Sequence, residues 1–96
     1  MSYKLSIVNL IKEIIENGSI QKIRDYIYNM MITNISSNTI IKDILNVILL
    51  NNNDITMDKK LEIINCASKY EYRLSKSRRD IIHIEAFIDG IMNILK

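Results

Sequence analysis

The sequence predicts an all-α fold, a compact bundle of about five antiparallel helices in a single domain covering residues 1–96. Two observations support this prediction. Apolar residues recur three and four positions apart in nearly every segment, whereas the strict alternation of a half-buried strand is nowhere sustained. Hydrophobic residues make up 48% of the chain and charged residues 25%, which is typical of a folded domain and unlike a disordered segment.

The first two predicted helices are separated by a short turn. The first helix covers about Ser2–Glu16, and Asn17–Gly18 ends it because glycine readily adopts the left-handed conformation of a C-cap. The hydroxyl of Ser19 can then cap a second helix, which continues to about Ile32.

A third helix is predicted over Asn38–Leu50, with Ser37 as its N-cap. Ile40 and Val47 widen its apolar face until the helix approaches burial on several sides. We therefore expect this helix to lie at the centre of the bundle.

A fourth helix begins after the polar run Asn51–Asp54, with Thr56 as its cap, and runs to about Lys76. Its predicted apolar band consists of Met57, Leu61, Ile64, Ala67, Tyr70 and Leu74. The segment Ser77–Asp80 has the spacing of a capping box, and the fifth helix runs from there to the C-terminus.

The last two helices should form an antiparallel hairpin that closes at Ser77–Arg79. Counting back from this turn places Tyr70 opposite residues 86 and 87 of the fifth helix. Tyr70, Leu74 and Phe87 are therefore predicted to form the structural core of the hairpin, with the two aromatic rings packed together.

No constellation of residues indicates catalysis, so the chain is predicted not to be an enzyme. Neither glycine has the setting of a phosphate-binding loop. One cysteine, Cys66, and one histidine, His83, are too few for a structural zinc site, and the hairpin register places them apart. We expect no catalytic residue, no cofactor and no metal ligand.

Charge favours a protein partner over nucleic acid, because a formal net charge of +2 is small for a domain that grips DNA. The densest basic cluster surrounds the fourth turn and is expected to be a solvated surface. Contact with DNA or with an acidic neighbouring subunit is the alternative. The candidates for that contact are Lys69, Lys76, Arg78 and Arg79.

The chain is predicted to act inside the cell, in a reducing compartment. A single cysteine cannot form an internal disulfide. The N-terminus shows no secretory cleavage site, and the longest uncharged stretch, residues 26–41, is too polar to span a membrane.

Two neighbouring strings carry a resemblance to a known family. The first lies within Asn65–Leu74 and includes Tyr-Glu-Tyr-Arg-Leu, and the second lies within Ile81–Ile88 and includes His-Ile-Glu-Ala-Phe. Together they resemble the last two helices of eukaryotic-type replication factor C small subunits, and Ile23–Leu49 resembles the same subunits more loosely. The chain departs from the family pattern at Ser75–Ser77, where a glycine commonly follows the arginine-leucine pair.

The resemblance implies the C-terminal collar domain of a clamp-loader small subunit. Such a domain joins four others in a five-membered collar, and the whole complex acts on a sliding clamp and primer-template DNA. The family's ATPase residues have no counterpart here, so the chain is expected to be an excised domain or a short gene product. A nuclear location, or a viral replication site, follows from the same resemblance.

Other clamp-loader subunits are therefore the expected partners, bound through the collar. The candidate partner interface comprises Tyr72, Arg73, His83 and Glu85. The rival hypotheses are a small helical nucleic-acid-binding protein and an unrelated helical adaptor from a virus or an AT-rich genome.

Overall fold

The computed structural model describes residues 3–51, 54–76 and 79–95, and every regular element in this part of the chain is helical. The elements are α1 (Tyr3–Lys12), a π-helical turn η1 (Glu13–Asn17), α2 (Ile20–Ile32), α3 (Ser37–Asn51), α4 (Met57–Lys76) and α5 (Asp80–Leu95). The predicted all-α fold is confirmed.

The first helix ends as its sequence predicts, with one difference. Gly18 adopts φ 68° and its backbone N–H donates to the carbonyl of Glu13 at 2.6 Å, so the last turn widens into the π-helical η1. Ser19 then caps α2, because its hydroxyl accepts a hydrogen bond from the Lys22 N–H at 3.5 Å. Thr56 caps α4 in the same way through the Lys59 N–H, at 3.3 Å.

The N-cap predicted at Ser37 is wrong by one residue. The hydroxyl of Ser36 accepts from the Thr39 N–H at 3.2 Å, so Ser36 caps α3. Ser37 is the first residue of the helix and is buried, and its hydroxyl donates to the carboxylate of Asp80 at 2.8 Å. This bond joins the beginnings of α3 and α5. The capping partner predicted for Asp80, Ser77, lies outside the described residues.

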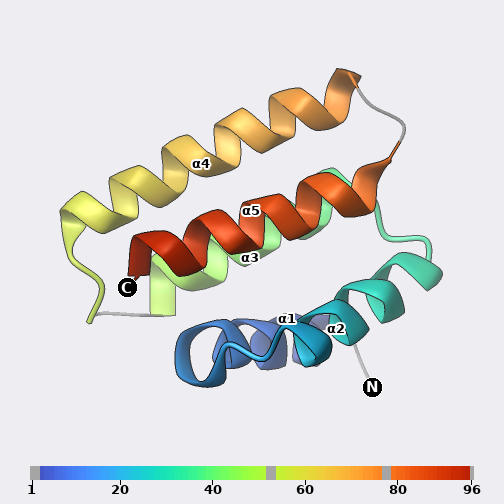
Figure 1. The fold of residues 1–96 in the computed structure, drawn as a ribbon, viewed down its shortest axis with the longest axis horizontal. Helices are drawn as coiled ribbons and strands as arrows, with labels where there is room; N and C mark the ends of the chain where they lie inside the picture. The colour runs from blue at the N-terminus through green and yellow to red at the C-terminus, as the bar shows by residue number, and fades with distance from the viewer. Residues whose placement is uncertain (1–2, 52–53, 77–78, 96) are drawn as a thin grey trace.

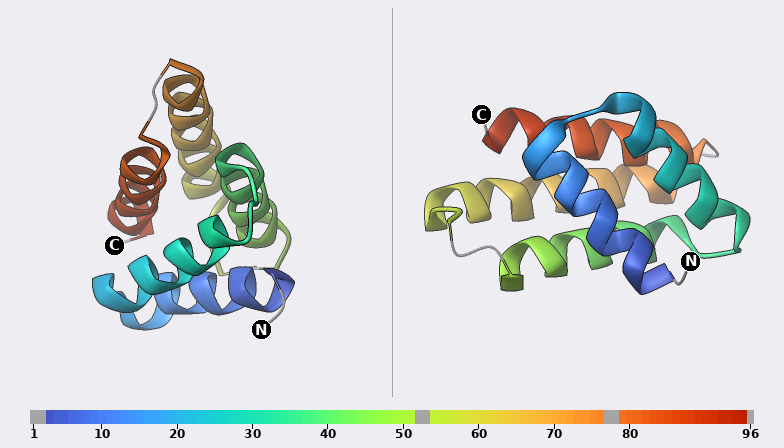
Figure 2. Two further views of the ribbon diagram at one scale, coloured as in Figure 1. Left: turned by 90° about the vertical axis from the view of Figure 1, so that its right-hand side faces the viewer. Right: turned by 90° about the horizontal axis from the view of Figure 1, so that it is seen from below.

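The helices form an antiparallel hairpin, α4–α5, and a second pair, α1–α2 (Figure 1). The remaining helix, α3, lies beside α5, and both lie between α4 and the α1–α2 pair. Figure 2 shows α4 at the opposite end of the molecule from α1 and α2. The central position predicted for α3 is confirmed, since it packs against α1, α4 and α5. Four of its isoleucines have no exposed surface, namely Ile40, Ile41, Ile44 and Ile48.

The apolar band predicted for α4 is wrong in the first half of the helix. Met57 is 68% exposed and Leu61 is 52% exposed, whereas Ile63 is completely buried. Leu61 and Ile63 point about 200° apart on a helix of 3.6 residues per turn, so only one of them can face the core. Ala67 and Leu74 lie on the buried side, as predicted.

Candidate partner interface

The α4–α5 hairpin is held by close contacts at two levels. At one level, a Cβ added to Gly90 would lie 2.7 Å from the Sγ of Cys66, which shows how closely the two helices approach. At the other level, the rings of Tyr70 and Phe87 have centroids 6.4 Å apart and an interplanar angle of 50°. Phe87 is completely buried, and the geometry is that of a favourable tilted aromatic pair.

Three cations of α4 lie over tyrosine rings near this hairpin. Lys69 Nζ and the guanidinium carbon of Arg73 lie 5.5 and 5.2 Å from the ring centroid of Tyr70. Lys76 Nζ lies 5.8 Å from the ring centroid of Tyr72. All three cations are exposed, so each such contact is worth only about 0.5–1 kcal/mol and can be exchanged for a contact with a partner.

The predicted basic cluster is therefore placed on the surface at the end of the hairpin. Arg79 is also exposed, just before α5 begins, while Arg78 lies outside the described residues. None of Lys69, Arg73 and Lys76 pairs with a carboxylate in the part of the chain that the structure describes. Lys69, Arg73 and Lys76 are therefore available to an anionic group from outside the domain.

The four candidate interface residues differ in how far they are exposed. Tyr72 is 66% exposed and Arg73 is exposed, whereas His83 and Glu85 are half-buried. Glu85 forms an ion pair with Arg24 of α2, with Oε1 3.2 Å from Nε, and so contributes to the contact between α2 and α5. Glu85 therefore pairs with Arg24 and not with Arg73, whose guanidinium lies over the ring of Tyr70.

Comparison with known proteins decides the family. The family model described as "Replication factor C subunit 3, C-terminal domain" matches residues 3–96. The chain belongs to the replication factor C family. The resemblance inferred from the two hairpin strings is confirmed.

Two replication factor C relatives illustrate the match. A putative small subunit from Acanthamoeba polyphaga mimivirus is 43% identical over 70 residues, which are 73% of this chain and 18% of the relative. Replication factor C subunit 3 from Arabidopsis thaliana is 31% identical over 75 residues, which are 78% of this chain and 20% of the relative. The chain thus spans about a fifth of the length of these relatives, and it corresponds to the helical C-terminal domain and not to the ATPase domain.

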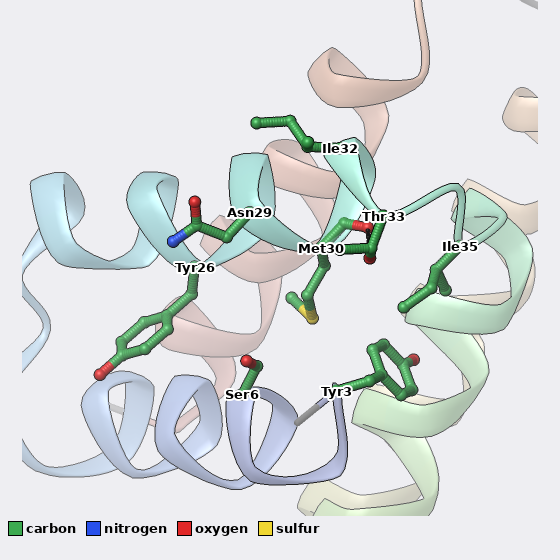
Figure 3. A pocket seen from close by; sticks show the side chains of 8 residues that line it. All are labelled: Tyr3, Ser6, Tyr26, Asn29, Met30, Ile32, Thr33 and Ile35. Atoms are coloured by element: carbon green, nitrogen blue, oxygen red, sulfur yellow. Dashed lines mark hydrogen bonds between the residues drawn. The ribbon is translucent and has the colours of Figure 1, made fainter. Parts of the chain in front are cut away.

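A cleft between α1, α2 and the beginning of α3 was not predicted from the sequence. It has a volume of about 470 Å³. Figure 3 shows Met30 and Tyr26 pointing from α2 toward α1, where Tyr3 and Ser6 form the opposite wall. Ile35, in the turn before α3, contributes to the end of the cleft near Tyr3.

Tyr3 is fixed at the edge of this cleft by a hydrogen bond from its hydroxyl to the carboxylate of Asp43 in α3. Burial, the hydrogen bond and the negative charge of Asp43 together raise the pKa of Tyr3 well above the usual value of 10. Burial also raises the pKa of the Cys66 thiol, against a smaller opposing effect of Lys69. A thiol with a raised pKa is a weak nucleophile at neutral pH, which fits a packing role for Cys66.

Across residues 3–51, 54–76 and 79–95, no three histidine, cysteine or acidic side chains are grouped so that they could hold a metal ion. Within the same ranges, no helix combines the length and the apolar character needed to cross a membrane.

Proposed function

We propose that this chain is a non-catalytic collar domain of a replication factor C small subunit, which assembles with other clamp-loader subunits. Through the whole complex it supports the loading of a sliding clamp onto primer-template DNA, in the nucleus or at a viral replication site. The observation that carries this proposal is the match of residues 3–96 to the C-terminal domain of the family.

The distribution of apolar surface supports an oligomerisation role. Large apolar side chains remain exposed on the α1–α2 pair and on the α4–α5 hairpin. They include Ile20, Ile32, Leu61 and Ile82, which are between 50 and 77% exposed. Apolar side chains exposed on several helices can be covered by a partner subunit, and a contiguous patch of them marks an interaction site. Surplus apolar surface of this kind is what a domain in a multi-subunit collar requires.

Tyr72 and Arg73 are the residues on which we place the contact with a neighbouring subunit. Both are exposed on α4, and tyrosine and arginine are the residue types most enriched in energetically important interface positions. His83 and Glu85 are half-buried on α5 and would lie at the rim of such a contact.

Co-assembly with the other clamp-loader subunits tests the proposal. Arg73→Ala should weaken binding at least about fivefold, because truncating an important interface arginine costs on the order of 1 kcal/mol or more. Lys22→Ala, which removes an exposed cation from α2, is the matched control and should bind like wild type. If the wild-type chain does not associate with any clamp-loader subunit, the proposed function is wrong.

The exposed basic cluster favours a second candidate, direct binding of nucleic acid. Lys69, Lys76 and Arg79 would contact phosphates, and the affinity of the isolated chain for DNA would then fall steeply with salt. Binding of an oligonucleotide measured at several salt concentrations tests this alternative. A flat salt dependence, or an unchanged affinity in a Lys69→Ala/Lys76→Ala variant, would exclude it.

A further inference from the structure

The outward side of α4 is a long surface that no other described helix covers. Ile63, Ala67 and Leu74 face the core, and α4 packs against α5 and α3 on that side only. Figure 1 and the left view of Figure 2 show α4 at the edge of the molecule. We call the opposite side, centred on Asn65, the outer α4 face.

Charges on the outer α4 face are separated along the helix. Asp58 and Glu62 are exposed in its first half, and Lys69, Arg73 and Lys76 are exposed in its second half. The result is a surface that is acidic at one end and basic at the other.

The other two lysines of α4 do not change this pattern. Lys60 is half-buried and donates from Nζ to the carbonyl of Leu49 at 3.3 Å. Lys59 is also half-buried and lines a small cavity with Ile15 and Leu95. Both lysines therefore point away from the outer α4 face.

The same face is also divided lengthwise into an apolar edge and a charged edge. Leu61 and Tyr72, 52 and 66% exposed, are separated by about three helical turns of 3.6 residues and so lie on one edge. Glu62 and Arg73 have the same separation and lie together on the other edge. Each edge thus carries one member from each half of the helix.

This pattern is complementary to itself when two copies of α4 lie antiparallel. A two-fold axis at the outer α4 face, at the level of Ala67 along the helix, places the first half of one helix against the second half of the other. It also keeps like edges on the same side. Glu62 and Arg73 stand at nearly equal separations from Ala67, as do Leu61 and Tyr72. The acidic half of each copy then faces the basic half of the other, and Leu61 faces Tyr72.

We propose that the outer α4 face binds the outer α4 face of a second copy of this chain in an antiparallel, two-fold symmetric dimer. Glu62 of each copy pairs with Arg73 of the other, and Asp58 pairs with Lys76, while Leu61 and Tyr72 form the apolar strip between the copies. To make these pairs, Arg73 and Lys76 leave tyrosine rings, and neither leaves a carboxylate of the described residues 3–51, 54–76 and 79–95.

The size of the contact predicts a weak dimer. A helix of 20 residues is about 30 Å long and about 10–12 Å wide, so an α4 pair covers roughly 350 Å² on each copy. Stable complexes bury about 800 Å² on each partner, and smaller contacts are typical of transient ones. The dimer should therefore form only at high protein concentration and weaken with added salt, because its ion pairs are solvent-exposed.

A consequence of this dimer rests on the proposed function. The dimer covers Tyr72 and Arg73, which are also the residues placed at the contact with a neighbouring subunit. Self-association and collar assembly would then exclude each other, so the dimer would hold the chain in a form that has not yet assembled. The dimer itself does not depend on the proposed function.

Charge reversal tests the dimer by sedimentation equilibrium of the whole chain. Asp58→Lys/Glu62→Lys should raise the dimer dissociation constant at least tenfold, and so should Arg73→Glu/Lys76→Glu. An equimolar mixture of the two variants should associate again, because each supplies the charges that the other requires. Far-UV circular dichroism establishes that each variant is folded. Leu61→Ser, which changes the apolar strip at an exposed position, should also weaken the dimer.

The matched control is Lys22→Glu/Lys42→Glu, which reverses the charge of two exposed lysines on α2 and α3. This variant should dimerise like wild type. A wild-type chain that stays monomeric up to its solubility limit overturns the proposal, and so does a mixture of reversed variants that fails to associate. Binding of single-stranded DNA by a monomeric chain, lost in Arg73→Glu/Lys76→Glu, would instead assign the face to nucleic acid. Co-assembly with other clamp-loader subunits, measured separately, reports on the proposed function alone.

Discussion

Gly90 lies at a close approach of α5 to α4, and its replacement by alanine should destabilise the domain. A Cβ at this position would lie 2.7 Å from Cys66 Sγ, so either the thiol or the two helices must shift. Overpacking of this kind typically costs about 1–3 kcal/mol. Gly90 lies inside α5, where alanine is favoured over glycine by about 1 kcal/mol. The free energy of unfolding should therefore fall by roughly 0–2 kcal/mol.

A double-mutant cycle separates these two effects. Cys66→Ala removes the sulfur atom that the new Cβ would meet, so Gly90→Ala in that background should raise the free energy of unfolding by about 1 kcal/mol. The coupling between the two positions should then be about 1–3 kcal/mol, within the range found for residues in contact. Denaturant unfolding followed by far-UV circular dichroism measures all four variants. If Gly90→Ala has the same effect in both backgrounds, the close approach of the helices at this point is wrong.

Four further predictions concern the core, the surface, the α1 contact and activity. Phe87→Ala should cost about 3–5 kcal/mol in unfolding free energy because Phe87 is completely buried, whereas Tyr72→Ala, at an exposed aromatic, should cost far less in the same denaturant experiment. Arg73→Ala should cost about 1 kcal/mol or less in monomer stability, and a thermal melt as low as that of Phe87→Ala would contradict its placement on the surface. The raised pKa of Tyr3 means that the folded state holds the phenol proton more tightly than the unfolded state. The contribution of Tyr3 to the free energy of unfolding is therefore present below about pH 10 and is lost as the pH rises above that value. Tyr3→Phe should remove this part of the alkaline destabilisation, and an unchanged pH dependence would show that the bond to Asp43 does not have this effect. The purified chain should hydrolyse no ATP, and turnover above that of a heat-treated control would contradict its assignment to a non-catalytic domain.

Local sequence signals determined the helices and most of their ends. The glycine at position 18 and the hydroxyls of Ser19 and Thr56 act on backbone groups within a few residues, so their effect can be derived without knowledge of the fold. The hairpin register also followed from the sequence, because a short connection leaves little freedom in how two antiparallel helices align. That register placed Tyr70 against Phe87, and the ring contact is present.

Some choices between neighbouring residues were decided only by tertiary packing. Leu61 lies four residues after Met57 and Ile63 lies four residues before Ala67, so each continues an apolar stripe at helical spacing, and contacts with α3 and α5 decided that Ile63 is the buried one. Ser36 and Ser37 are equally good caps in isolation. Ser37 lies inside the helix and bonds to Asp80, which is distant in the sequence and close only in the folded state.

The family could likewise be inferred from the sequence, whereas the surfaces of the domain could not. Two short strings of residues were sufficient to indicate replication factor C, because each string lies within a single helix and can be recognised from the sequence alone. The ion pair between Arg24 and Glu85, the cleft beside Tyr3 and the outward direction of the charged side of α4 depend on how whole helices are rotated against one another. That rotation is set by the summed burial of side chains from several helices, and periodicity along a single helix does not contain it.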